Sequence, residues 1–151
     1  MRRSVIFGIC AAALAAGAAR AGSPEARNPV HCSIAFQVTY EIAKEGLGPD
    51  SALSRELHGR LVWQALAAAR FPRTDQSAAD AETLRAQFAA GDSDEVLALT
   101  EACMKRQDAH PDFREARIEK QARDGFPKEP LSRRASLEQL KGVYERAARG
   151  E

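Results

Sequence analysis

The stretch SDEVLALTEACMKRQDAHP, residues 93–111, is predicted to form an α-helix and carries a cysteine on the face that would enter the core. Ser93 can cap its amino end, and the two acidic residues that follow complement the positive end of the helix dipole. Pro111 ends the helical pattern. The residues that share one face at helical spacing are Val96, Leu99, Thr100 and Cys103.

Three upstream segments show the same helical spacing of apolar residues. Residues 28–48 have a proline at a favourable first position and glycines at the end. Residues 49–72 can be capped by Asp50 or Ser51, and residues 77–92 open with a capping pattern and close at a glycine. Apolar residues are mostly Ala and Leu, and no strand-like alternation competes. The predicted core stripe of the second helix is Leu53, Leu57, Leu61, Ala65 and Ala69.

The first 21 residues, MRRSVIFGICAAALAAGAARA, have the pattern of a secretory signal peptide. Two arginines precede a short apolar run, and Ala19 and Ala21 supply the small residues at −3 and −1 of a cleavage site after Ala21. The apolar run is shorter than the roughly 20 residues that a membrane-spanning helix needs. Cys10 lies inside this run without a lipoprotein-type box in front of it. We therefore expect export to a bacterial periplasm and a soluble product.

Removing residues 1–21 takes three arginines and no acidic residue, which leaves 19 basic and 21 acidic residues. This balance gives no electrostatic reason to expect nucleic acid or an anionic membrane as a partner. About 130 residues remain, which suits one domain.

The mature chain has two cysteines, Cys32 and Cys103, and in an oxidising compartment they are expected to form one structural disulfide. Four helices with short connections prefer antiparallel neighbours, so the start of the first helix and the end of the fourth lie at the same end. A disulfide between these two positions closes that topology. We predict an all-α fold: an up-down-up-down four-helix bundle over residues 22–111, stapled by one disulfide.

Residues 112–151 form a charged tail that contains two prolines and a short terminal helix. The helical pattern after residue 111 can run to about Asp124, and its charges, REARIEKQARD, are expected to form a solvated face. Ser136 begins a capping pattern for the terminal helix. This helix either docks on the bundle, which we favour, or folds on contact with a partner.

His110-Pro111-Asp112 matches the tripeptide of J-domains, but the preceding helix is acidic at its start and the expected compartment lacks ATP. The end of a helix explains it adequately. In the predicted bundle the disulfide brings His31 and His110 to one end, where they could bind zinc or copper. The alternative is that both are exposed histidines at helix termini. No catalytic signature occurs, so we expect no enzyme activity and no cofactor.

Three stretches, HCSIAFQVTYEIA, ARFP and LRAQFAAGDSDEVLALTEACMK, resemble small exported helical proteins of alphaproteobacteria that carry one cysteine in the first helix and another in the last. The resemblance covers roughly residues 30–105 and implies a fold and a location, since that family has no assigned activity. The chain is also similar, more weakly, to HdeA-type periplasmic acid chaperones, although its cysteines lie further apart.

Two functions follow as hypotheses. The first is a periplasmic, non-enzymatic module that binds another protein or acts like a chaperone. The second is a small-ligand or metal-binding protein that uses the end of the bundle near His31 and His110.

Overall fold

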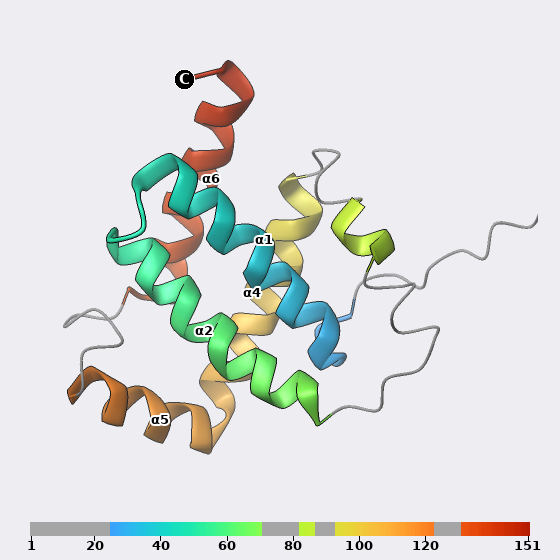
Figure 1. Cartoon of the computed structure of the whole chain (residues 1–151), viewed down its shortest axis with the longest axis vertical. Coiled ribbons are helices and arrows are strands. Elements are labelled where there is room, and N and C mark those ends of the chain that lie inside the picture. The colour runs from blue at the N-terminus through green and yellow to red at the C-terminus, as the bar shows by residue number, and fades with distance from the viewer. Residues whose placement is uncertain (1–24, 71–81, 87–92, 123–130) are drawn as a thin grey trace, which may run out of the picture.

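The computed structural model describes residues 25–70, 82–86, 93–122 and 131–151, and every regular element in these ranges is an α-helix. The fold is therefore all-α, as predicted. Figure 1 shows the helices, coloured by their order along the chain. Their bounds are α1 Pro29–Leu47, α2 Ala52–Ala69, α4 Ser93–Ala109, α5 Pro111–Ala122 and α6 Arg133–Arg149.

Local sequence signals set the ends of α1 and α2. The Asn28 side chain accepts a hydrogen bond from Val30 N at 2.9 Å, and Pro29 occupies the first turn. Gly48 follows α1 with φ of 87°, a conformation that side chains with a Cβ rarely adopt. Ser51 then caps α2 by accepting from Ser54 N at 3.1 Å. The chain thus reverses over four residues, and α1 and α2 lie side by side in opposite directions (Figure 1).

The His-Pro-Asp tripeptide marks a break between two helices. Helix α4 ends at Ala109, and Pro111 is the first residue of α5. Proline has no N–H to donate, so it starts a helix more readily than it continues one. This outcome agrees with the interpretation of the tripeptide as a helix end.

Helix α6 begins one turn earlier than its predicted capping pattern. Ser132 is the N-cap and accepts from Ala135 N at 3.1 Å. The prediction that Ser136 opens the helix is wrong, because Ser136 lies within α6 and is buried. The error arises because two serines stand four residues apart, and either could cap an isolated helix.

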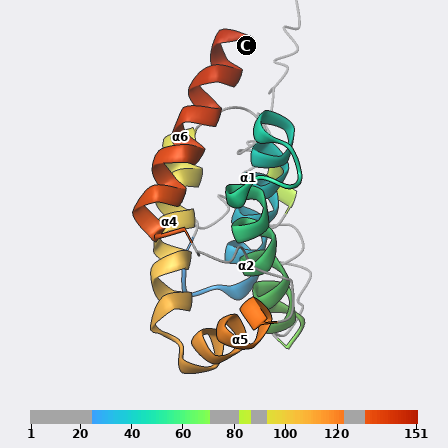
Figure 2. The same cartoon turned by 90° about the vertical axis from the view of Figure 1, so that its left-hand side faces the viewer.

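The helices pack in two layers. Figure 2 shows α1 and α2 on one side and α4 and α6 on the other, with α5 at the end near α2. Leu140 and Val143 of α6 are buried, so the terminal helix docks on the bundle. A Cβ built on Gly46 would lie 2.6 Å from Val143 Cγ1, and glycine therefore permits the close approach of α1 and α6. The central core comprises Cys32, Ile34, Ala35, Phe36, Ala43, Leu53, Leu57, Leu84, Val96, Leu99, Cys103, Met104 and Leu140.

Cys32 and Cys103 form the predicted disulfide, with their Cα atoms 5.6 Å apart. It joins the first turn of α1 to the second half of α4 across the two layers. The up-down-up-down order of four helices stays a prediction. Of its third helix the structure describes residues 82–86, which are helical and bury Leu84, while the predicted ends at Ser77 and Gly91 lie outside the described residues.

The predicted stripe of α2 is right in its first half and wrong in its second. Leu53 and Leu57 are fully buried, but Ala65 and Ala69 are exposed. The buried residues of α2 include three large polar side chains, Glu56, Arg60 and Gln64. No described helix is both long and apolar enough to cross a lipid bilayer.

Candidate functional site

The most unusual feature of the interior is a buried ion pair on α2. Glu56 has 0% and Arg60 1% of its surface exposed, and Arg60 Nε donates to Glu56 Oε1 at 2.9 Å. The two residues are one helical turn apart, a spacing at which side chains of a helix meet. Such pairs normally lie on the surface, since removing both charges from water is costly unless each is fully hydrogen-bonded.

Two residues of α4 hold the other edge of the Arg60 guanidinium. Its Nη2 donates to Asp108 Oδ1 at 2.9 Å, and its Nη1 donates to Gln107 Oε1 at 3.2 Å. Asp108 is partly exposed and also lies 3.7 Å from Arg133 at the start of α6. Arg60 thereby connects α2 to α4, and Arg133 of α6 lies near the same Asp108 carboxylate.

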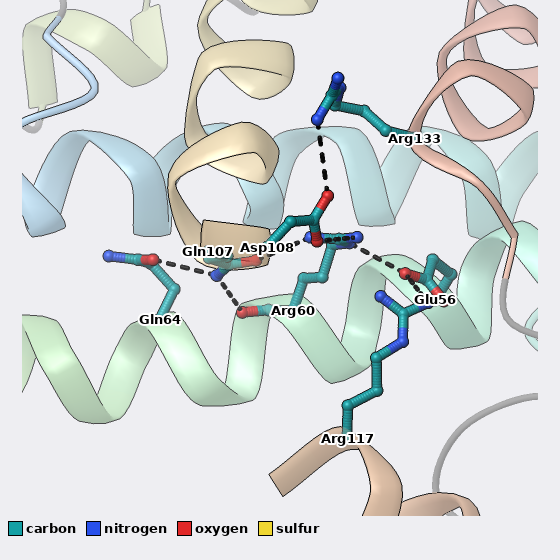
Figure 3. Close-up of polar contacts among 7 residues, drawn as sticks. All are labelled: Glu56, Arg60, Gln64, Gln107, Asp108, Arg117 and Arg133. Carbon is teal, nitrogen blue, oxygen red and sulfur yellow. Dashed lines mark hydrogen bonds and ion pairs between the residues drawn. The ribbon is translucent and has the colours of Figure 1, made fainter. Parts of the chain in front are cut away.

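The Gln107 amide extends this network toward the other end of α2. Its Nε2 donates to the backbone oxygen of Arg60 at 3.1 Å and to Gln64 Oε1 at 3.0 Å. Gln64 Nε2 in turn donates to the backbone oxygen of Pro29 at 3.2 Å, which adds the start of α1. Figure 3 shows Gln64 and Gln107 at the end of the network opposite Glu56.

Helix α5 joins the network through Arg117. Its Nη2 lies 2.7 Å from the Glu56 carboxylate, which therefore accepts from two guanidinium groups (Figure 3). The interpretation of the α5 charges as a solvated face is wrong for Arg117, whose side chain is only 14% exposed. The pattern alone could not show this, because the partner lies 61 positions away on α2.

An aromatic cluster fixes α5 beside this ion pair. Phe113 is buried, with its ring 5.2 Å from the Arg60 guanidinium and 5.9 Å from that of Arg117. Trp63 packs edge to face against Phe113, with their ring centroids 5.3 Å apart. The ring centroid of His110 also lies 5.3 Å from that of Trp63. Phe113 is thus the side chain that anchors the first turn of α5 to α2.

A groove opens between α2 and α5 next to this anchor. Its volume is about 110 Å³. Among the described residues that line it, Arg117 is the one with a charged side chain. Leu66 stands at its edge with 62% of its surface exposed. The remaining lining residues are Gly59, Val62, Trp63, Phe113 and Ala116. The groove is an apolar recess. Helix α5 forms one of its walls, and the Glu56–Arg117 ion pair holds α5 in place.

The two candidate metal-binding histidines have different surroundings. His31 is buried and its Nδ1 accepts from Glu25 N at 3.0 Å. His110 is exposed at the break between α4 and α5, where it packs on Trp63. Within the described residues no group of three or more His, Cys, Asp or Glu side chains could hold a metal ion. A site made by these two histidines stays a prediction.

The sequence pattern did not indicate that Glu56 and Arg60 are buried or that Arg117 is largely covered. One signal was present: Glu56 and Arg60 stand at the i, i+4 spacing. That spacing indicates a pair on one helical face but does not indicate whether the face is buried. Only the approach of α4 and α5 to this face decides it.

Comparison of the chain with protein-family models, with curated proteins and with solved structures finds no match.

Proposed function

We propose that this protein is a non-enzymatic helical module of the bacterial periplasm that binds another polypeptide, with the α2–α5 groove as its docking surface. The observation that carries the proposal is the apolar recess beside Leu66. A cavity of about 150 Å³ holds one benzene-sized group, so a groove of about 110 Å³ suits one aliphatic side chain of a partner. Such recesses are where binding energy concentrates in protein interfaces.

The rigid wall of the groove supports this proposal. Binding costs less when the receiving surface is ordered beforehand, because fewer side chains lose freedom on contact. Phe113 and Arg117 order α5 through the aromatic cluster and the ion pair with Glu56. The partner is expected to be another periplasmic protein, consistent with the resemblance to exported helical proteins.

Export is the second part of the proposal. Its support is the signal-peptide pattern of residues 1–21, which lies outside the described residues, together with the Cys32–Cys103 disulfide, a bond typical of oxidising compartments. Mass spectrometry of the protein purified from cells tests it. We expect an amino terminus at Gly22 and a mass that corresponds to one intact disulfide. An unprocessed chain with free thiols would contradict export.

The test of binding is an aggregation assay with a client protein unfolded by heat or by acid, followed by light scattering. We expect the mature protein to suppress aggregation, and Leu66→Ser to lose most of this effect. Leu66 is 62% exposed, so this substitution removes groove surface at little cost to the fold. Equal far-UV circular dichroism of variant and wild type checks that the fold is intact.

Ile118→Ser is the matched control. Ile118 is 68% exposed and lies on α5, one of the two helices that border the groove, but it does not line the groove. It should protect the client as well as the wild type does. If both substitutions weaken protection equally, general hydrophobicity and not the groove is responsible. If the wild type protects no client at several-fold molar excess, the chaperone-like function is refuted.

A further inference from the structure

A second cavity shares Trp63 with the α2–α5 groove. Its volume is about 160 Å³, and it is bounded by the start of α1, the second half of α2 and the end of α4. Trp63 lines both recesses, while the exposed side chains of Arg27, Arg106 and His110 surround only this one. The cavity therefore combines an aromatic wall with a basic rim.

The charges around this cavity are of one sign. Two arginines line it, and no Asp or Glu does among its described lining residues. Neither Arg27 nor Arg106 takes part in an ion pair between described residues, and the nearby Asp108 is engaged by Arg60 and Arg133. Each guanidinium group can donate hydrogen bonds to an anion, and two of them at one recess favour a negatively charged ligand.

The inner wall of the cavity is fixed by hydrogen bonds. Gln64 and Gln107 are buried and bonded to each other, and Gln64 also donates to the backbone oxygen of Pro29. In Figure 3 these two amides form the end of the network away from Glu56. The wall is thus ordered before any ligand arrives, which lowers the entropic cost of binding.

We infer that this cavity binds a small organic anion, a carboxylate carried on a single ring or a short apolar body. The arginines on the rim would hold the carboxylate, and Trp63 would contact the apolar part. A volume of about 160 Å³ is close to the roughly 150 Å³ that accommodates benzene, so the recess can receive one ring. This site is distinct from the proposed polypeptide groove, although Trp63 lines both.

Benzoate is the probe for this inference. Trp63 is the single tryptophan of the chain, so its fluorescence reports directly on the cavity wall. We expect a saturable change with a midpoint below about 1 mM at low salt, confirmed by calorimetry. Raising the salt concentration should weaken binding, because the rim arginines are exposed and screened. Benzamide, neutral and of the same shape, should bind at least about tenfold more weakly, and sulfate, which lacks a ring, should bind weakly too.

Three substitutions decide whether the rim is responsible. Arg27→Gln and Arg106→Gln should each weaken benzoate binding about tenfold, while Arg134→Gln, at an exposed arginine of α6, should leave it unchanged. Leu66→Ser should also leave it unchanged, so that failure of the groove and failure of this cavity are distinguished. Equal affinity for benzamide and benzoate, no effect of either rim substitution, or no saturable binding by calorimetry would each overturn the inference.

Discussion

Replacing Glu56 with glutamine tests the buried network at its fully buried carboxylate. In the wild type both Arg60 and Arg117 donate to this group at 2.9 Å or less. A glutamine of the same size keeps one acceptor oxygen, but its amide nitrogen would face a guanidinium that also donates. Arg60 retains Asp108 and Gln107, whereas the ion pair between Arg117 of α5 and residue 56 of α2 is lost.

The expected magnitude follows from the burial of the pair. A hydrogen bond to a charged group contributes about 1.5–3 kcal/mol, and breaking a buried ion pair costs about 3–5 kcal/mol because a charge stays desolvated. Since one acceptor survives in Glu56→Gln, we expect a loss of about 3 kcal/mol. For a chain of 151 residues this corresponds to a fall in Tm of roughly 10 °C.

The measurement is urea unfolding of the disulfide-intact protein, followed by circular dichroism, together with hydrogen exchange of the α5 amides. Faster exchange confined to α5 at low urea would show that Glu56 holds this helix in place. Glu138→Gln is the matched control, since it removes an equivalent carboxylate from an exposed pair with Arg134. It should leave the unfolding midpoint unchanged.

A result of equal midpoints for Glu56→Gln and the wild type would refute the reasoning. It would mean that water reaches the Glu56 carboxylate and that the ion pairs with Arg60 and Arg117 contribute no net stability. Something other than the Glu56–Arg117 ion pair would then have to hold α5 in place beside the α2–α5 groove.

Further substitutions at the contact of α1 and α6 and within α6 test the docking of the terminal helix. Gly46→Ala should destabilise the protein by about 1–3 kcal/mol in urea unfolding, because its Cβ would lie 2.6 Å from Val143 Cγ1, and Val143→Ala in the same chain should restore most of the loss. The control Gly142→Ala, which meets only the end of a flexible arginine at 3.7 Å, should be neutral or stabilising; an equal loss in both would contradict the packing argument. Burial raises the pKa of Tyr144 from 10.0 to about 12, so the folded state holds this proton more tightly than the unfolded chain. The stability of the wild type should be intact below pH 10 and fall between pH 10 and 12, and Tyr144→Phe should lose less over this interval in unfolding curves measured at each pH. Identical pH profiles would show that Tyr144 is solvated.

Much of the fold follows from local signals. The start of α1 at Pro29, the cap of α2 at Ser51 and the break at Pro111 depend on residues within one helical turn, so they could be predicted. The disulfide was predictable because two cysteines remain after the signal pattern is set aside, and one pairing is then possible.

The sequence by itself thus determined the helical class, most of the helix ends and the Cys32–Cys103 bond. Only the tertiary structure decided which face of α2 is buried, and therefore that Glu56 and Arg60 are removed from solvent and that Arg117 of α5 pairs with Glu56. Periodicity ranks faces by hydrophobicity, and a face that carries Glu and Arg is ranked as exposed. Charged side chains from α4 and α5, 48 and 61 positions away, compensate for the desolvation. The sequence does not show that these side chains are close, because only the packing of the helices brings them together.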